Sequence, residues 1–335
     1  MRSFTSAALA RSVLAHGAIK RIDTSAAANA PGVLAVYTAK DFESEGLAGI
    51  PNIFPLKGRD GTPLKVPFVF GLAKERVRHI GQAYAVVIAK TLGQAKDAVE
   101  LIDADIEALP PVTDMTVAAQ APAIFPDVPN LVLDWFAGNE AATSEAFAKA
   151  SHVTRLRLDN NRLVVAAMEP RAAIGSYNRA SDEYTLYVAN QNPHVERLLM
   201  TAFVMGLPEH KVRVIAPDVG GGFGSKIYLY AEDVCLTWAS KKLNRTIKWT
   251  CERAEAFLCD AHGRDHDSHA ELAMDEVGPH SPARRDLATI VEAAERAADL
   301  CRQMLAYSGQ GKIEIRRIDL GGLVESMVRL LEHSI

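Results

Sequence analysis

The sequence has 335 residues, 48% hydrophobic and 23% charged, a balance typical of globular proteins with substantial cores. A chain of this length predicts about two domains of roughly 100–200 residues each. The formal net charge of −4 gives no general basic field, so neither nucleic acid nor an anionic membrane surface is a predicted partner. No apolar run approaches the roughly 18 residues of a membrane span, so membrane insertion is not predicted.

The cysteine pattern favours free thiols. Cys235, Cys251, Cys259 and Cys301 form no CxxC pair, so zinc and iron–sulfur ligation are not predicted. We interpret these cysteines as ordinary thiols of a protein in the reducing cytoplasm. The basic, alanine-rich N-terminus lacks the apolar core and cleavage site of a secretory signal peptide.

The first part of the chain is predicted to be one compact α+β or α/β unit, residues 1–125. Short apolar strands alternate with one amphipathic helix, and the elements fall at residues 33–38 (strand), 83–89 (strand), 91–102 (helix) and 103–109 (strand). Pro110 and Pro111 end the last strand. The proline-rich, aperiodic stretch near residues 115–130 marks the predicted boundary.

A second unit is predicted over residues 126–276. Strands at residues 184–188 and 212–216 flank a helix at residues 193–205. Asn192 is the predicted cap of that helix, Pro193 suits its first turn and Gly206 suits its exit. A further helix is predicted at residues 227–243, with an apolar face made by Ala231, Val234, Cys235, Trp238 and Ala239.

The pattern changes in the remaining residues, 277–335, which are predicted to be helical. Ser281 and Pro282 give a helix-start signal. Apolar residues then recur at alternating spacings of four and three, at Leu287, Val291, Ala294, Ala298, Cys301 and Leu305. This heptad pattern favours a helical hairpin or a coiled-coil partner, although short bundles show it as well.

The most informative local feature is the glycine cluster Gly220-Gly221-Gly222-Phe223-Gly224, which follows a predicted strand and is predicted to open directly into a helix. Glycines let backbone amides approach a ligand, and a helix N-terminus adds partial positive charge, so the loop suits a phosphate-bearing cofactor. It has neither the P-loop nor the GxGxxG order. The alternative interpretation is a structural turn that needs positive φ angles.

Four motifs carry a family resemblance. They are MEPR (168–171), NQNPH (190–194), GGGFGSK (220–226) and KWTCERAEAFLCDAHGRDH (248–266). Their order and spacing resemble the large subunits of xanthine dehydrogenase and aldehyde oxidase family molybdenum hydroxylases, particularly those of aerobic carbon monoxide dehydrogenases. The resemblance covers roughly residues 10–275. It implies a mixed α+β fold, in which an α/β hammerhead domain precedes the first part of a molybdopterin-binding domain.

The resemblance also implies site residues. Gln191 matches a glutamine that lies beside molybdenum and donates to an oxygen ligand, and it is the implied catalytic residue. Gly221, Gly222, Phe223 and Gly224 match the loop that contacts the pterin cofactor. From the residues alone, Gln191 is equally interpreted as a loop residue that bonds to backbone, because most side-chain hydrogen bonds go to backbone or water.

The implied reaction is oxidative hydroxylation, or oxidation of carbon monoxide, by an oxidoreductase that holds molybdopterin in its plain or cytosine dinucleotide form. Electrons would leave through iron–sulfur and FAD subunits, and the large subunit would pair with a second copy. The family's glutamate base and substrate-selecting loop match no residue of this chain, so we expect a truncated site that is catalytically incomplete alone.

Two other kinds of site are weighed and set aside. His262, His266 and His269 have spacing that suggests metal ligands. In the family arrangement they fall on a turn and a strand, where alternation separates His266 from His269, so polar or hydrogen-bonded histidines are favoured. No GxSxG motif places a hydrolase nucleophile.

The tail resembles a different family. Residues 281–335 are similar to the second dimerisation helix and linker of sensor histidine kinases, but they contain no HDFNN-like phosphoacceptor motif. The alternative hypotheses are therefore a dimerisation or signalling module formed by these helices, and an inactive chimeric product. The simplest interpretation of the tail is a short helical appendage.

Overall fold

The computed structural model describes residues 4–51, 55–67 and 69–274. The chain forms two units, residues 1–138 with 157–270, and residues 139–156 with 271–335. In the second unit, helix α4 (Glu140–Lys149) begins where the Asn139 side chain accepts a hydrogen bond of 3.0 Å from the Ala142 amide. The predicted helices of residues 277–335 lie outside the described residues.

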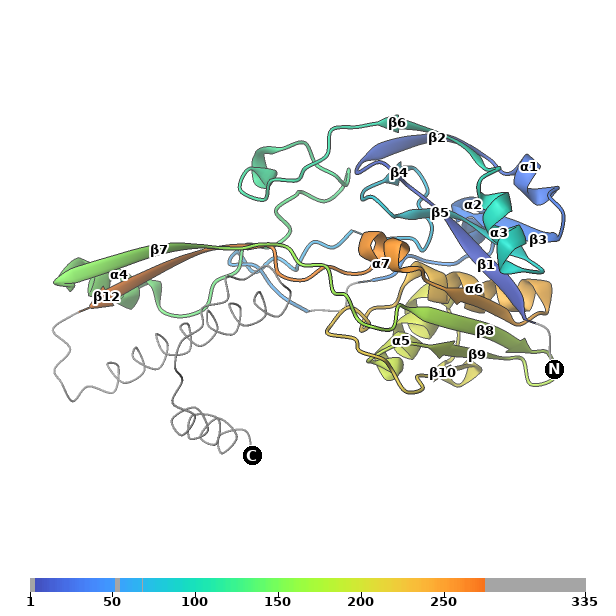
Figure 1. The fold of residues 1–335 in the computed structure, drawn as a ribbon. Coiled ribbons are helices and arrows are strands. Elements are labelled where there is room, and N and C mark those ends of the chain that lie inside the picture. The colour runs from blue at the N-terminus through green and yellow to red at the C-terminus, as the bar shows by residue number, and fades with distance from the viewer. Residues whose placement is uncertain (1–3, 52–54, 68, 275–335) are drawn as a thin grey trace, which may run out of the picture. The chain divides into compact units, whose positions relative to one another are not determined.

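One seven-stranded sheet organises the first unit (Figure 1). Its strands run in the order β10 (Val212–Ile215), β9 (Glu183–Val188), β8 (Ala172–Asn178), β11 (Ile247–Thr250), β1 (Thr5–Arg11), β5 (Ala83–Ala89) and β3 (Val33–Thr38). The pairs β10–β9 and β1–β11 are parallel, and the other pairs are antiparallel. This mixed sheet confirms the predicted α+β class.

The parallel pairing of β1 with β11 brings the first strand of the chain beside a strand some 240 residues later. Thr5 pairs with Ile247, and the Thr5 amide donates to the Thr246 carbonyl at 3.0 Å. A single sheet therefore extends across the two domains predicted from the sequence, whose bounds at residues 125 and 276 stay a prediction.

Smaller elements complete the described chain. A three-stranded sheet has the order β4 (Arg76–Val77), β2 (Gly17–Asp23) and β6 (Asp103–Ala108), and β7 (His152–Asn160) pairs with β12 (His266–Met274). The remaining short helices are α1 (Ser25–Ala28), α2 (Ala39–Ser44), α7 (Arg253–Cys259) and two 3₁₀ turns, Ala118–Gln120 and Glu209–Lys211. No helix among the described residues is both long and apolar enough to cross a membrane.

Alternation along β5 divides the core into two faces, as expected for a strand buried on both sides. Ala85 and Val87 pack with helix α3 (Leu92–Val99), whereas Val86 and Ile88 pack with the opposite cluster. The predicted strand and helix are both confirmed here. The Thr91 side chain caps α3 by accepting a hydrogen bond of 3.3 Å from the Gln94 amide.

Helix α6 (Ala231–Leu243) crosses the sheet on the face opposite α3 and is buried from Glu232 to Ser240. A Cβ atom at Gly175 of β8 would lie 2.5 Å from the Leu236 carbonyl, so only glycine permits this close crossing. The predicted start of the helix near residue 227 is wrong, because residues 223–226 form a turn and residues 227–230 an irregular segment before the helix.

Helix α5 (Pro193–Leu198) continues as a π-helix, Leu199–Met205, and ends at Gly206 with φ +63°. The predicted helix and its glycine exit are confirmed. Asn192 is the N-cap residue as predicted, but its side chain makes no capping bond. The turn is held instead by Asn190, whose side-chain oxygen accepts from the Asn192 amide.

Candidate functional site

Residues 220–226, which we name the Gly-Phe loop, lie between β10 and α6. Gly221 and Gly224 have φ angles of +91° and +87°, as the structural interpretation of the glycines expects. Phe223 also has a positive φ, +49°, and its side chain is 77% exposed. The loop therefore carries a strained aromatic residue on its surface.

The predicted contribution of a helix N-terminus to this loop is wrong. Helix α6 begins at Ala231, beyond the turn that follows the loop, and its first turn carries Glu232 and Asp233. Because the field of a helix end falls off within about one turn, α6 gives the loop no helix-end positive charge. The donors present in the loop are backbone amides.

Gln191 clamps the loop through its side-chain carbonyl. Oε1 accepts hydrogen bonds from the Gly224 amide at 3.1 Å and the Lys226 amide at 3.2 Å. A Cβ atom at Gly222 would lie only 2.2 Å from Oε1, so glycine is required for this contact. The backbone-bonded interpretation of Gln191 is thus confirmed, and the arrangement leaves the Nε2 group as the donor end of an exposed amide.

A buried lysine anchors both ends of the Gly-Phe loop. Lys226 is 1% exposed, and its Nζ donates to the Glu169 carbonyl at 2.8 Å and to Glu169 Oε2 at 3.0 Å. The same carboxylate accepts from the Gly220 amide at 2.6 Å. Partial burial acts to raise the pKa of Glu169, but the bonds from Lys226 and Gly220 outweigh it and hold the pKa below its ordinary value.

Tyr230 ties the turn after the loop to the rest of the unit. Its hydroxyl donates to the Ser225 carbonyl at 2.5 Å and accepts from the Ala261 amide at 3.0 Å. The Arg171 guanidinium lies over the tyrosine ring, 3.6 Å from its centre. Burial raises the pKa of Tyr230 above its ordinary value, so the hydroxyl remains a donor.

Arg171 belongs to a set of buried and partly buried side chains, paired by salt bridges, that we name the charge cluster: Arg11, Arg171, Glu232, Glu255 and Asp260. Arg171 bonds Glu232 at 3.0 Å and Asp260 at 2.6 Å, and Arg11 bonds both Glu232 and Glu255. Burial would raise the pKa of Glu232, but Arg171 and Arg11 hold it well below its ordinary value. The cluster is thus ionised and mutually compensated.

Two further carboxyls, those of Glu196 and Asp233, are buried but do not belong to the charge cluster. Glu196 of α5 is 0% exposed, and neither carboxyl oxygen has a hydrogen-bond partner. Burial and repulsion from Asp233 raise its pKa well above the ordinary value. Burial also raises the pKa of Asp233, to about 7. Both groups favour the protonated form.

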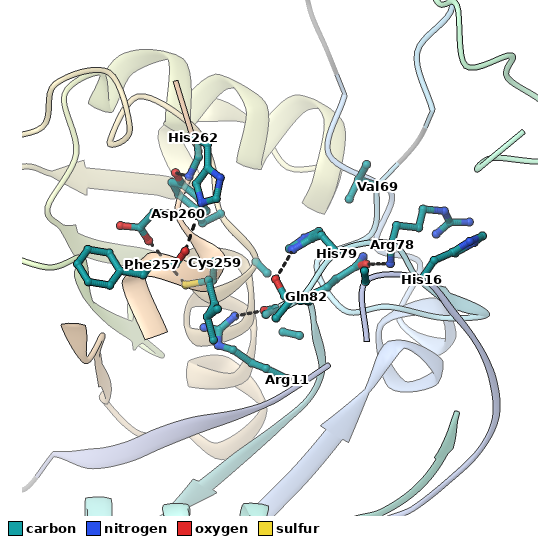
Figure 2. Close-up of a pocket in the computed structure, with 18 of the residues that line it drawn as sticks. Arg11, His16, Val69, Arg78, His79, Gln82, Phe257, Cys259, Asp260 and His262 are labelled. Atoms are coloured by element: carbon teal, nitrogen blue, oxygen red, sulfur yellow. Dashed lines mark hydrogen bonds between the residues drawn. The ribbon is translucent and has the colours of Figure 1, made fainter. Parts of the chain in front are cut away.

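A cavity of about 920 Å³ lies beside the charge cluster. Figure 2 shows Arg11 running toward the sulfur of Cys259, with Asp260 and His262 above it and His79 across the cavity. Arg11 also donates to the Gly81 carbonyl at 3.1 Å. One wall of the cavity is therefore the outer side of the charge cluster.

The histidines considered for metal binding do not gather in the described residues. His262 bonds the Phe257 carbonyl at 3.2 Å, and His266 begins strand β12. The side chain of His269 lies outside the described part of the structure. Among described residues, the side chains close enough to share a metal ion are instead Cys251, Cys259 and Asp260.

Sequence reasoning missed the residues that support the loop. Glu169, Arg171 and Lys226 stood inside the motifs that carried the resemblance but were given no role. A lysine within an otherwise glycine-rich and apolar stretch, and an acid–proline–arginine run just before a strand, were the available signals. Their partners lie far away in the chain, so spacing alone could not pair them.

Comparison with known families identifies both parts of the fold. Residues 3–110 match the aldehyde oxidase and xanthine dehydrogenase a/b hammerhead domain, and residues 124–289 match the molybdopterin cofactor-binding domain. The second match continues past residue 277, where the kinase-like tail was predicted to begin, and the kinase resemblance gains no support from it.

Individual relatives agree with these matches. The chain is 35% identical over 283 residues to the carbon monoxide dehydrogenase large chain of Afipia carboxidovorans, covering 80% of this chain and 34% of that one. It is 33% identical over 273 residues to the nicotine 6-hydroxylase large subunit of Paenarthrobacter nicotinovorans, covering 81% and 33%. The chain therefore spans about a third of the length of these relatives.

Solved structures show the same fold. The crystal structure of the Cu,Mo-CO dehydrogenase superimposes with a TM-score of 0.74 at 33% identity, covering 82% of this chain and 35% of that one. Quinoline 2-oxidoreductase from Pseudomonas putida 86 gives 0.70 at 29% identity, covering 83% and 34%. With its hammerhead and molybdopterin cofactor-binding domains, the chain belongs to the xanthine dehydrogenase and aldehyde oxidase family, and it is similar to the molybdenum-cofactor-binding large subunits of that family.

Proposed function

We propose that the Gly-Phe loop and Gln191 form one wall of a molybdenum-cofactor site in an oxidoreductase of this family. The observation that carries the proposal is the orientation of Gln191. Two loop amides occupy its Oε1, so the amide cannot turn over without losing both bonds, and Nε2 is presented as a donor. A donor held in this way suits an oxygen ligand on the metal.

The residues present fit the cofactor. Gly221, Gly222 and Gly224 keep the backbone of the loop free of side chains, and nothing lies within 4 Å of the place where a Cβ of Gly224 would stand. Phe223 offers an exposed apolar face beside them. We propose that these four residues contact the pterin, in its plain or its cytosine dinucleotide form, and that Gln191 faces the metal.

When bound, the cofactor would supply the two-electron redox chemistry that the family uses on carbon monoxide, aldehydes or nitrogen heterocycles. The part of the chain described here would bind and orient it. The buried Lys226 fixes the loop against Glu169, and Gln191 holds a hydrogen-bond donor at its surface. Catalysis would require the family's glutamate base, which no residue of this chain matches.

Partners follow from the same proposal. The relatives include large subunits and a subunit of a dehydrogenase complex, so we propose iron–sulfur and FAD subunits and a second large subunit as partners. The three described cysteines, Cys235, Cys251 and Cys259, are free thiols, which favours a reducing cytoplasm as the compartment. The dimerisation alternative rests on residues 281–335, outside the described part, and stays a prediction.

Cofactor retention tests the proposal. The full chain is purified from cells with an ample supply of cofactor, and molybdenum is measured by plasma mass spectrometry and pterin by fluorescence after oxidation. We expect both to copurify with the chain and to be lost in Gln191→Leu. Gln120→Leu, in the exposed 3₁₀ turn, is the matched control and should retain both. A folded wild-type chain without molybdenum or pterin would contradict the proposal.

A further inference from the structure

Two of the cysteines lie next to each other in the folded chain. Cys251 directly follows β11 and Cys259 ends α7, and their Sγ atoms lie within 4.8 Å of each other. Cys251 is 3% exposed, whereas Cys259 is partly exposed and lines the cavity shown in Figure 2. One sulfur of the pair is therefore open to a small solute, and the other lies behind it.

Cys259 lies against the charge cluster. Arg171 Nη2 donates to Cys259 Sγ at 3.2 Å, and the thiol donates to Asp260 Oδ1 at 3.6 Å. Figure 2 shows the Arg11 side chain extending toward the same sulfur. A guanidinium at this distance stabilises negative charge that develops on the sulfur as it attacks an electrophile. The pair thus joins an accessible sulfur, a nearby positive charge and a second thiol.

The same arginine argues against a metal ion at this place. Arg171 already bonds both Cys259 and Asp260, at 3.2 Å and 2.6 Å, so it occupies two of the three groups that a metal would need. Its charge also repels a cation at short range. Oxidation of the Cys259 sulfur, by contrast, does not require Cys259 or Asp260 to break its bond to Arg171 first.

We propose that Cys259 and Cys251 form a peroxide-sensitive pair, in which Cys259 reacts first with hydrogen peroxide and Cys251 then closes a disulfide. In the first step the Cys259 sulfur bonds one peroxide oxygen and the O–O bond breaks. The thiol proton joins the leaving hydroxide as water, and sulfur is oxidised while peroxide is reduced.

In the second step the Cys251 sulfur attacks Cys259, and the S–O bond of the sulfenic acid breaks. The leaving hydroxide takes the Cys251 proton as a second water. The sum is two thiols and one peroxide giving one disulfide and two waters. A disulfide needs an S–S distance of about 2 Å, so the sulfurs approach from within 4.8 Å by side-chain rotation, for which Cys259 has room at the cavity.

The order of the two steps follows from burial. The hydrogen bond with Cys259, together with burial, raises the pKa of Cys251 above the ordinary thiol value. A buried, protonated thiol reacts slowly with peroxide but can attack a sulfenic acid directly beside it. Arg171 also stacks on Tyr230, whose hydroxyl holds Ser225 of the Gly-Phe loop. A disulfide at Cys259 would therefore change a contact of the arginine on which Tyr230 packs.

Peptide mass spectrometry of the full chain after peroxide titration tests the proposal. The background is Cys301→Ser, which leaves the pair and Cys235 as the only cysteines. Cys235 is the internal control, since it is 1% exposed in the apolar core. We expect a cross-linked Cys251–Cys259 peptide that has lost two hydrogen atoms, that disappears on reduction with dithiothreitol, and that forms while Cys235 is unmodified.

Two variants assign the roles. In Cys251→Ser, dimedone should trap a sulfenic acid at Cys259, and no cross-link should form. In Cys259→Ser, both products should be lost. Circular dichroism melts show whether each variant is folded. The cross-link in the Cys301→Ser background is measured without these two variants, so it tests the proposal even if one of them does not fold. A parent chain without the cross-link after peroxide, or one in which Cys235 oxidises first, would overturn the proposal.

Discussion

The Gly-Phe loop and the charge cluster lie on neighbouring segments of the same unit but are built in opposite ways. The loop exposes Phe223 at a positive φ, buries Lys226 beneath it, and is held by two backbone amides that donate to Gln191. The cluster is buried and consists of ions that compensate one another. Tyr230 connects the two, with its ring on Arg171 and its hydroxyl on Ser225. The comparison teaches that an exposed loop residue can be positioned by charges that lie mostly beneath the surface.

The largest effect is expected where a buried ion loses its partner. Arg171→Met leaves Glu232 and Asp260 partly uncompensated, and such changes cost about 3–5 kcal/mol of unfolding free energy. The measurement is urea denaturation followed by circular dichroism. Arg21→Met removes an exposed arginine that pairs with Asp103 and should change little. Equal effects of the two substitutions would contradict a special role for the cluster.

A smaller loss is expected at the loop anchor. Lys226→Met removes the hydrogen bonds to Glu169, but that carboxylate is 39% exposed on its side chain and can turn to water. We therefore expect a loss of about 1–3 kcal/mol in the same denaturation experiment. Lys74→Met, at an exposed pair with Glu43, is the matched control. A loss as large as that of Arg171→Met would show that the loop and the cluster do not differ as described.

The two buried carboxyls outside the charge cluster predict a pH dependence opposite in sign to that of Glu232, whose lowered pKa makes its contribution to stability fall at acidic pH. Burial raises the Asp233 pKa from 3.8 to about 7, so the folded chain binds a proton that the unfolded chain releases in this range. Stability should therefore fall as the pH rises from about 4 to about 7. Asp233→Asn keeps an acceptor for the Tyr230 amide and should flatten this fall.

Urea midpoints at several pH values, compared between wild type and Asp233→Asn, isolate this contribution from other titrating groups. His79 works in the opposite direction, since burial lowers its pKa, but it is common to both proteins. Glu196→Gln should act in the same direction as Asp233→Asn, because burial and repulsion from Asp233 raise the pKa of Glu196 as well. Parallel pH curves for wild type and both variants would contradict the assignment.

Much of the scaffold was predictable because its signals are local. The strands at residues 33–38 and 83–89 coincide with β3 and β5, and the apolar stripe at three- and four-residue spacing predicted α3. Helix α6 was placed too early because the apolar pattern continues upstream of Ala231. The helix begins instead where the Asp233 side chain accepts from the Tyr230 amide, and the Tyr230 hydroxyl holds the preceding segment through Ser225 and Ala261.

The site was predictable only in part. The glycine motif pointed to the loop, and the resemblance pointed to Gln191, but the phosphate-site argument from a helix N-terminus was wrong. The charge cluster could not be found from spacing, since Arg11, Arg171 and Asp260 are far apart in the sequence and meet only in the folded unit. Cys251 and Cys259 are eight residues apart and form no CxxC motif, so spacing did not indicate that their sulfurs lie close together.

The smallest change in the free energy of unfolding is expected at Gln191. Its hydrogen bonds to the loop give the most direct test of how the site is held. Hydrogen exchange of the Gly224 and Lys226 amides reports whether Oε1 clamps the loop. Gln191→Glu retains an acceptor oxygen and should preserve protection, whereas Gln191→Leu should abolish it at a cost of about 1 kcal/mol. The amide of Val86 in β5 should be unaffected in both variants. Unchanged protection of Gly224 and Lys226 in Gln191→Leu would contradict the claim that Gln191 holds the loop.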